Sequence, residues 1–328
     1  MSRMAPISHL TTVGQTPAGH DVHAIHLQHG PLQARILTLG AIVQDLRLRG
    51  VGHSLVVGCE QLDRYYSDMR YVGALVGRYA NRIAQGRFDW NGTRYQLSQN
   101  ALGRHCLHGG AEGSDVTLWT VQHLTQSQVH LHARFGDGHM GFPGALDVDC
   151  VIRLTDNAAL EFDVQATTTA ATPVSFAHHG YFNLAGSADI NDHQLEIAAQ
   201  HYVDVDAEGI PTGRLMDVVG SDIDFSQLTP IGSRVVDHNF CVAPARGAVQ
   251  RVARLVSPRP GVTMTVATTE PGLQVYTGDH FTGCAPRAGV ALETQSWPDA
   301  PNQPHFPNAI LQPDDTYQST TKYGFDVL

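Results

Sequence analysis

Short segments in which apolar and polar residues alternate recur along the whole chain. The clearest are 34–39, 128–135, 146–154, 160–166, 194–197, 262–268, 273–276 and 290–295. An alternation of period two places successive side chains on opposite faces of a strand, one face buried and the other solvated. Turn-forming pairs such as Gly109-Gly110 and Pro271-Gly272 separate these segments, and we find no long stretch of helical period. The pattern therefore predicts an all-β fold, a large and mostly antiparallel β-sandwich.

No segment of the sequence has the composition of an interdomain linker. The Pro-containing stretches 257–261 and 297–307 are short and carry aromatic or apolar residues, which is typical of ordered loops. We therefore expect residues 1–328 to form a single domain.

Composition narrows the classes of protein and partner. The chain has 328 residues, 42% of them hydrophobic, and a formal net charge of -10, which disfavours nucleic acid as a partner. Residues 1–19 contain no unbroken apolar stretch, so we expect neither a signal peptide nor a membrane span. The cysteines are five in number, widely spaced and without a Cys-x-x-Cys pair. These features predict a soluble cytoplasmic protein with reduced thiols.

Segment 173–184 carries a first candidate for chemistry, because it combines histidines with aromatic and apolar residues. As a strand it would place His179, Tyr181 and Asn183 on one face and Phe182 and Leu184 on the other. A polar, aromatic face beside an apolar one suits a sugar site. The alternative is a core histidine that is merely satisfied by a neighbour.

Acidic and amide residues in the C-terminal half supply further candidates. In 290–295, Glu293 shares a face with Ala291 and Gln295, and a carboxylate inside an otherwise apolar strand is costly unless it is paired or used. Gln274 and Asp237 are natural partners for vicinal hydroxyls, because their polar atoms donate or accept at fixed angles. The alternatives are an exposed edge strand for Glu293 and ordinary turns for the other two.

Two glycine-rich segments in the first third of the chain add donors. Asn81 and Arg82 lie among small residues in 77–84, and His108 directly precedes Gly109-Gly110. Glycine lets a backbone approach a ligand closely, and arginine presents a fork of charged donors. A solvated basic turn and a hairpin end are the alternative interpretations.

Taken together and in their order along the chain, these segments resemble the aldose 1-epimerase (galactose mutarotase) family. The resemblance covers nearly the whole sequence and rests on Leu55-Val-Val-Gly58 with Tyr65, Gly73 to Ala84, Leu107 to Gly110, Gly141 to Gly144, Tyr181 to Leu184, Ile210 to Gly213, Asp237 to Phe240, Pro271 to Gly278, Leu292 to Asp299 and Thr320 to Tyr323.

This resemblance implies the family's β-supersandwich and an isomerase that interconverts the α and β anomers of free aldoses such as galactose or glucose. It makes His179 the general acid and Glu293 the general base, and it assigns Asn81, Arg82, His108, Asp237 and Gln274 to the sugar hydroxyls. Tyr181 is also expected to bind the substrate, because it shares the predicted face of His179. Opening a hemiacetal needs a base at the C1 hydroxyl and an acid at the ring oxygen, which a carboxylate and an imidazole supply. We expect no cofactor and no metal, a small-molecule sugar as substrate, and a monomer or homodimer.

The sequence departs from the family's pattern in two places. Relatives commonly have Asn before the catalytic histidine, whereas this chain has His178. The segment between Gln274 and Glu293 is also shorter than in many relatives, which leaves the shape of the site's rim open.

Three other interpretations compete with this one. A metalloprotein is suggested by 19 histidines, among them His20, His23 and His26 at a spacing of three, but on a strand that spacing sends consecutive side chains to opposite faces. A non-catalytic sugar-binding protein on the same fold would need no His179 or Glu293. A hexose-phosphate 1-epimerase would need clustered Arg or Lys residues, which the sequence does not show.

Overall fold

Antiparallel strands form almost all of the regular structure. The structure is a computed structural model that describes residues 9–327, and strand accounts for 46% of it against 5% for helix. Neighbouring strands pair antiparallel, as β12 (Leu146–Leu154) does with β13 (Ala159–Thr168) along its full length. The predicted all-β fold is confirmed, and the described residues contain no helix with the length and hydropathy needed to cross a membrane.

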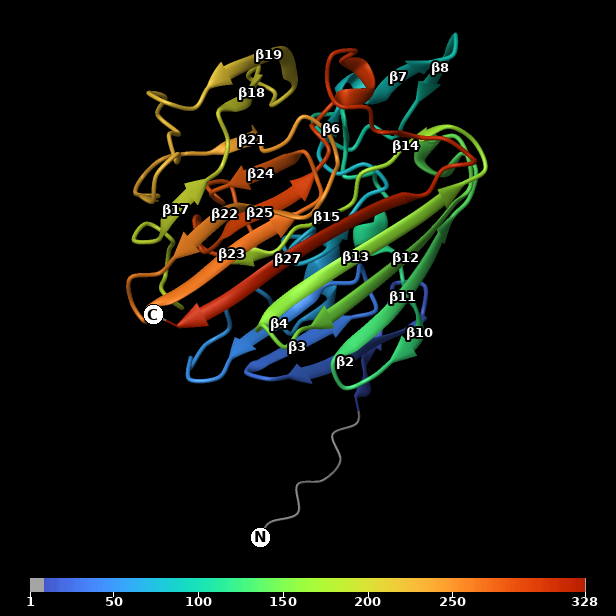
Figure 1. The fold of residues 1–328 in the computed structure, drawn as a ribbon. Coiled ribbons are helices and arrows are strands. Elements are labelled where there is room, and N and C mark those ends of the chain that lie inside the picture. The colour runs from blue at the N-terminus through green and yellow to red at the C-terminus, as the bar shows by residue number, and fades with distance from the viewer. Residues whose placement is uncertain (1–8, 328) are drawn as a thin grey trace.

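Three sheets and four short strand pairs make up the fold (Figure 1). The four-stranded sheet is β1 (Leu10–Gln15), β2 (Asp21–His29), β3 (Leu32–Leu37) and β4 (Val43–Leu48). The nine-stranded sheet runs in the order β10 (Thr120–Leu124), β11 (Gln128–Phe135), β12, β13, β27 (Tyr317–Val327), β23 (Val262–Thr268), β22 (Gln250–Val256), β17 (Gln194–Ile197) and β20 (Thr229–Pro230). The six-stranded sheet runs β16 (Tyr181–Phe182), β25 (Val290–Gln295), β24 (Gly272–Tyr276), β21 (Asp237–Cys241), β18 (His201–Val205) and β19 (Pro211–Asp217).

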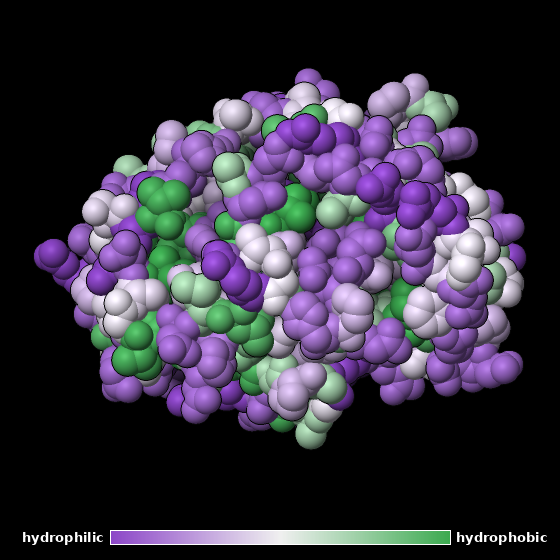
Figure 2. Space-filling model, turned by 90° about the horizontal axis from the view of Figure 1, so that it is seen from above, coloured by the Kyte–Doolittle hydropathy of each residue, from purple (hydrophilic) through white to green (hydrophobic). Residues whose placement is uncertain are grey.

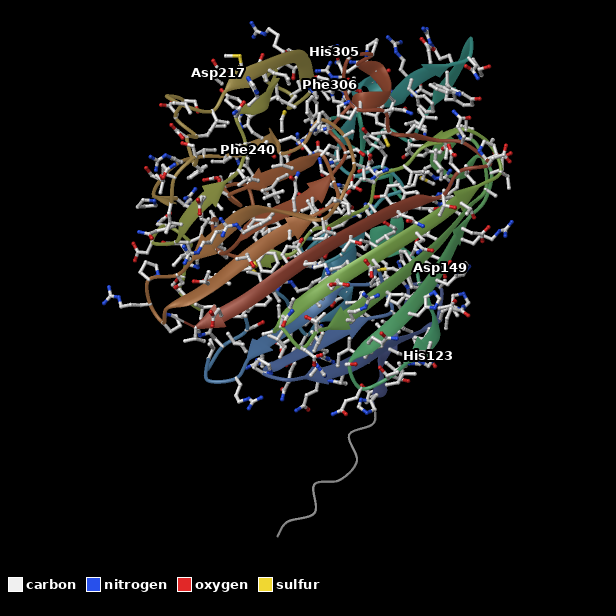
Figure 3. The ribbon with its side chains drawn as sticks, in the orientation of Figure 1. His123, Asp149, Asp217, Phe240, His305 and Phe306 are labelled. Carbon is white, nitrogen blue, oxygen red and sulfur yellow. The ribbon has the colours of Figure 1, made fainter. Side chains whose placement is uncertain are left out.

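Short elements connect these sheets. The strand pairs are β5 (Leu75–Val76) with β15 (Ala177–His178), β6 (Arg82–Ile83) with β9 (Cys106–Leu107), β7 (Arg87–Trp90) with β8 (Thr93–Gln96), and β14 (Thr172–Pro173) with β26 (Ile310–Leu311). The 3-10 helices are η1 (Leu62–Tyr66), η2 (Ala84–Gly86), η3 (Ser114–Val116), η4 (His139–Gly141) and η5 (Ala300–Asn302). Near η5, His305 Nε2 lies 2.7 Å from the carbonyl oxygen of Gly213 in β19, and Figure 3 shows His305 beside that strand.

The main hydrophobic core lies between the nine-stranded sheet and the other two sheets. It joins residues such as Phe162 of β13, Phe182 of β16 and Leu292 of β25, and each fully buried side chain of this size contributes about 1.5–3 kcal/mol. The hydroxyl of Tyr323 in β27 donates to the carbonyl oxygen of Leu292 at 3.1 Å, which ties two sheets together. The faces of β25 therefore differ: Val290 and Leu292 enter this core, whereas Glu293 points to the other side.

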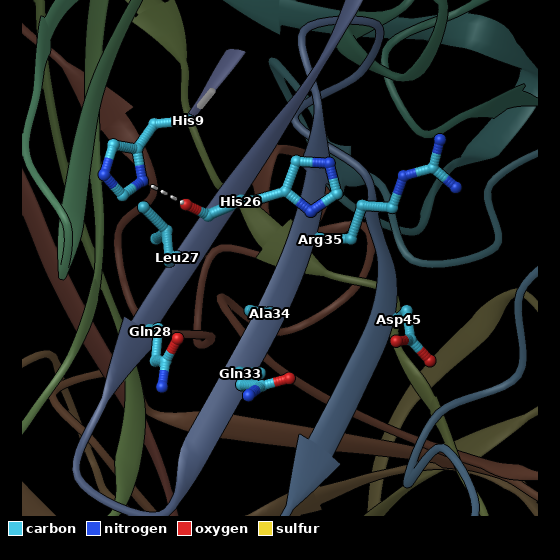
Figure 4. A pocket seen from close by; sticks show the side chains of 8 residues that line it. All are labelled: His9, His26, Leu27, Gln28, Gln33, Ala34, Arg35 and Asp45. Atoms are coloured by element: carbon cyan, nitrogen blue, oxygen red, sulfur yellow. Dashed lines mark hydrogen bonds between the residues drawn. The ribbon is translucent and has the colours of Figure 1, made fainter. Parts of the chain in front are cut away.

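The outer surface is mainly hydrophilic, with separate hydrophobic patches on the face seen in Figure 2. One surface hollow lies on the four-stranded sheet and is lined by His9, His26, Leu27, Gln28, Gln33, Ala34, Arg35 and Asp45 (Figure 4). His9 Nδ1 lies 3.2 Å from the carbonyl oxygen of His26 there. None of the residues proposed from the sequence for acid–base chemistry lines this hollow.

Candidate active site

His179 and Glu293 come together from segments more than a hundred residues apart. The distance from His179 Nε2 to Glu293 Oε1 is 3.6 Å, and their side chains are 7% and 3% exposed. His108 joins them, since one ligand atom from each of the three residues lies within 4.8 Å of the others. The structure thus brings together the predicted acid, the predicted base and one predicted hydroxyl-binding residue.

The backbone around His179 is held by a neighbouring segment rather than by a continuous strand. Residues 172–184 form only the two-residue strands β14, β15 and β16, and His179 lies between β15 and β16. The His179 amide donates to the carbonyl oxygen of Ala74 at 2.8 Å, and its own carbonyl accepts from the Gly73 amide at 2.9 Å. These two bonds fix the position from which the imidazole projects.

The predicted distribution of side chains around His179 is found in part. Tyr181 lies beside His179 with ring centroids 5.1 Å apart, whereas Phe182 and Leu184 enter the main core. Asn183 instead has a structural role, because its side-chain amide donates to the carbonyl oxygens of Ser187 and Ala288.

His178 points away from Glu293 and into the core. Its ring stacks on Phe162 with centroids 4.5 Å apart and meets Tyr323 edge-on at 5.5 Å. Burial lowers the pKa of His178 to about 3, so the ring is neutral at physiological pH. His178, at the position where the family resemblance led us to expect Asn, therefore packs as an aromatic side chain of the core.

The six-stranded sheet presents a row of polar side chains on the face of Glu293. Gln274 lies directly opposite Glu293 across β24 and β25, and Asn239 lies directly opposite Gln274 across β21 and β24. Asp237 is two residues from Asn239 and on the same face. The Gln274 side-chain amide donates to Asp237 Oδ1 at 2.6 Å. The alternation in the sequence predicted the faces of Glu293 and Gln274, and the strand register makes them neighbours.

Asn81, Arg82 and His108 are held together by the β6–β9 pair. The Asn81 amide donates to His108 Nδ1 at 3.1 Å, and the His108 amide donates to the Asn81 carbonyl oxygen at 3.0 Å. Arg82 extends toward the sheet, with one terminal nitrogen 3.8 Å from Asp237 Oδ2. The side chains of Arg82 and Asp237 are 24% and 42% exposed, so the polar row reaches solvent at this end.

The hydrogen bond to His108 also fixes its tautomer. Because Nδ1 accepts the Asn81 amide hydrogen, the proton of the neutral imidazole must sit on Nε2. Burial is the largest of several causes that lower the pKa of His108 well below its usual value, so the neutral form prevails. His108 then offers an N–H donor, while a metal would need the lone pair of Nε2. The geometry of this histidine disfavours a metal centre made of His108, His179 and Glu293.

Desolvation is the largest cause of the pKa shifts of His179 and Glu293. Burial raises the pKa of Glu293 well above its usual value; the charge of Asp237 adds to this, and Arg82 opposes it. Burial also lowers the pKa of His179 to about 4. Both directions favour the uncharged forms, a protonated carboxyl group on Glu293 and a neutral imidazole on His179.

Two residues near this cluster were not found from the sequence. Tyr71 contacts both histidines, with centroid distances of 4.8 Å to His108 and 6.4 Å to His179. Asn239 is 1% exposed and its side-chain amide has no hydrogen-bond partner among the described residues. Its alternation with Asp237 was a usable signal for Asn239, whereas nothing in the sequence around Tyr71 indicated a role.

The fold and this cluster define a β-sandwich protein in which a buried histidine and a buried carboxyl group lie beside a row of polar side chains. A sequence profile of the family described as aldose 1-epimerase matches residues 23–324. The chain belongs to the aldose 1-epimerase family.

Curated relatives match over almost their whole length. The chain is 36% identical over 338 residues to the galactose mutarotase of Bos taurus, covering 96% of this chain and 97% of the relative. It is 35% identical over 341 residues to the aldose 1-epimerase of Escherichia coli strain K12, with coverage of 96% and 98%.

Solved structures agree on the fold. The aldose epimerase homologue from C. elegans superposes with a TM-score of 0.86 at 25% identity, covering 93% of this chain and 99% of that one. The galactose 1-epimerase from Lactobacillus acidophilus gives a TM-score of 0.84 at 22% identity, with coverage of 97% and 98%. The predicted galactose mutarotase-like sandwich is confirmed.

Proposed function

We propose that the chain is an aldose 1-epimerase, an isomerase that interconverts the α and β anomers of free aldoses such as galactose or glucose. The observation that carries this proposal is the separation of 3.6 Å between His179 Nε2 and Glu293 Oε1, both buried beside amide and carboxylate side chains that suit hydroxyl groups. The family and its curated relatives, which are named galactose mutarotase and aldose 1-epimerase, support the same reaction.

The reaction needs two proton transfers and no other reagent. In the proposed cycle the Glu293 carboxylate removes the proton of the C1 hydroxyl, the C1–O5 bond breaks as the C1 carbonyl forms, and the His179 imidazolium protonates the ring oxygen. Rotation about C1–C2 exposes the other face of the aldehyde, and the same steps in reverse close the ring. Each positioned acid or base contributes about 10²- to 10⁴-fold.

The short distance between Glu293 and His179 allows a proton to pass directly from one side chain to the other. In the free protein burial favours a protonated Glu293 and a neutral His179, and the reactive form requires the opposite distribution. Moving the single shared proton from Glu293 to His179 produces carboxylate and imidazolium without proton exchange with solvent. Sugar hydroxyls that donate to the carboxylate, together with the charge of Arg82, favour this transfer in the complex.

The remaining site residues are assigned to holding the substrate. Arg82 and the side-chain amide of Asn81 supply donors, and Asp237 and Gln274 supply acceptors. The Nε2–H of His108 is assigned to the reacting end of the sugar, beside His179 and Glu293. Tyr181, whose ring stacks on Phe281 at 4.7 Å, supplies an aromatic wall on which the apolar side of a sugar ring can pack.

The charges around the site favour a neutral sugar over a hexose phosphate. Arg82 is partnered by Asp237, Arg70 is bonded to Asp115 at 2.9 Å, and Arg104 is paired with Glu208. A phosphate site needs cationic groups whose charge is available to the ligand. These three arginines are already paired with carboxylates.

Polarimetry with freshly dissolved α-galactose, α-glucose and other α-aldoses tests the proposal. We expect the purified protein to accelerate the approach to anomeric equilibrium, unchanged by a chelator, and the ranking of the sugars to identify the substrate. Binding of sugar without acceleration would identify a non-catalytic sugar-binding protein instead.

The proposal also covers the domain organisation, cellular location, oligomeric state and partners of the enzyme. We propose that residues 1–328 act as one domain, as a cytoplasmic monomer or homodimer without nucleic-acid or membrane partners. The buried thiols of Cys106 and Cys150 and the net charge of -10 support this setting. Size-exclusion chromatography with light scattering measures the oligomeric state.

A further inference from the structure

Tyr71 occupies an unusual backbone conformation next to the acid–base pair. Its φ is 71°, in the left-handed region that a bulky side chain rarely adopts. Asn81 and His108 also have positive φ, 66° and 51°. Such residues each cost about 1–3 kcal/mol and cluster at functional sites, where the surrounding structure holds them in place. The strain at Tyr71 therefore calls for a function of its side chain.

The ring of Tyr71 contacts both site histidines. Its centroid lies 4.8 Å from that of His108, with the planes tilted by 54°, and 6.4 Å from that of His179, with the planes within 22° of parallel. Offset contacts between rings are worth about 0.5–1.5 kcal/mol beyond the area they bury. The ring of Tyr71 therefore packs against the imidazoles of both His108 and His179.

Groups on the other sides of Tyr71 hold it in this place. The Arg70 guanidinium carbon lies 4.9 Å from the ring centroid, and Arg70 is itself fixed by Asp115 Oδ2 at 2.9 Å and by the carbonyl oxygen of Ala111 at 2.7 Å. The side-chain amide of Asn100 donates to the Tyr71 hydroxyl at 3.3 Å and to the carbonyl oxygen of Leu107 at 2.9 Å. Tyr71 is therefore linked through Asn100 to the residue that precedes His108.

The orientation of His179 depends on packing against Tyr71 more than the orientation of His108 does. His108 Nδ1 is fixed by the Asn81 amide, whereas His179 Nδ1 is buried without a hydrogen-bond partner among the described residues. A catalytic imidazole is ordinarily oriented by a hydrogen bond to its second nitrogen. Here the rings of Tyr71 and Tyr181 lie against His179 instead.

We propose that Tyr71 is a positioning residue for the anomerisation reaction, which sets the orientation of His179 by packing rather than by a hydrogen bond. This inference rests on the proposed function. Tyr71 acts through the imidazole, so its loss should lower kcat with little effect on KM. The proposal also explains why a strained tyrosine is present where a residue that tolerates positive φ would relieve the backbone.

The test compares three variants with the wild-type protein. Tyr71→Asn removes the ring but tolerates the left-handed backbone, Tyr71→Phe keeps the ring and loses the contact with Asn100, and Tyr66→Asn is the matched control. Tyr66 is a partly buried tyrosine that packs against the same hydrophobic cluster as Tyr71, and it makes none of the ring contacts to site histidines found among the described residues. Urea unfolding, kcat and KM are measured for each, together with ¹⁵N NMR spectra of the histidine rings.

We expect Tyr71→Asn to lower kcat by about 10- to 100-fold, the effect of misplacing a reacting group by about 1 Å, with KM changed by less than about 3-fold. Tyr71→Phe should lie between it and the wild type, and the His179 resonances should broaden or shift in Tyr71→Asn alone. A decrease in kcat no larger than that of Tyr66→Asn, or one that follows the loss of folded protein, would overturn the proposal. An inactive wild-type protein would instead reject the proposed function.

Discussion

A side chain at position 180 is predicted to fit only when the ring of His178 is removed. A Cβ added at Gly180 would lie 2.4 Å from His178 Cε1, 3.0 Å from Nε2 and 3.1 Å from Nδ1. Ordinary carbon contacts begin near 3.5 Å, so the ring would have to move by about 1 Å. It has no room to do so, because Phe162 stacks on it at 4.5 Å. The φ of Gly180 lies outside the left-handed region, so the ring is the main obstacle to alanine.

The size of the effect follows from this overpacking. Inserting a methyl group into a well-packed core costs about 1–3 kcal/mol, and we expect Gly180→Ala to lower the free energy of unfolding by that amount. His178→Asn removes the ring and opens space at the same place. In the double variant the alanine should cost much less, which corresponds to a coupling energy of about 1–2 kcal/mol.

Urea unfolding of the four proteins, the wild type, both single variants and the double variant, measures this coupling. The anomerisation rate provides a second measurement, because His179 lies between the two positions: kcat should fall in Gly180→Ala and recover in part in the double variant. Additive free energies, within about 0.5 kcal/mol, would show that the two side chains do not interact as described and would refute the reasoning.

Three further predictions concern charge. In the proposed cycle the Glu293–His179 pair must hold one proton, and burial raises the pKa of Glu293, so a profile of kcat/KM against pH should show activity falling as pH rises through that raised pKa, above the usual carboxyl value of about 4.3. Activity should also fall as pH drops through the pKa of His179, about 4, where the pair gains a second proton. The charge of Asp237 contributes to the raised pKa of Glu293, so Asp237→Asn should move the basic limb to lower pH. It should also raise KM several-fold in the same assay, because the sugar hydroxyls lose the anionic acceptor assigned to them. Arg246→Ala should lower the free energy of urea unfolding by about 3–5 kcal/mol, since it leaves Glu270, which is 0% exposed, without its bidentate partner; a smaller change than about 1 kcal/mol would contradict this.

The long strands could be predicted from the sequence because burial alternates along much of their length. Strand β12 is the clearest case: every second residue from Leu146 to Leu154 is buried. The alternation in β24 and β25 also grouped Gln274 with Tyr276, and Glu293 with Ala291 and Gln295, on common faces. It could not supply the strand register, which depends on pairing between segments, and so it did not predict that these two residues lie directly opposite each other.

The backbone that holds the site could not be read from periodicity. The segment around His179 contains strands of only two residues, too short to show an alternation, and its position depends on bonds to Gly73 and Ala74. Tyr71 adopts a left-handed conformation that its residue type does not favour. Tertiary contacts decide this conformation, and for this reason Tyr71 was missed.

Glu293 is proposed to act as the base opposite His179, and the rate of anomerisation by Glu293→Gln measures that role. Glutamine has nearly the same shape but cannot accept the proton, so kcat should fall by at least about 10²-fold while KM and the unfolding transition change little. A folded Glu293→Gln protein that anomerises aldoses at a rate close to that of the wild type would contradict the account.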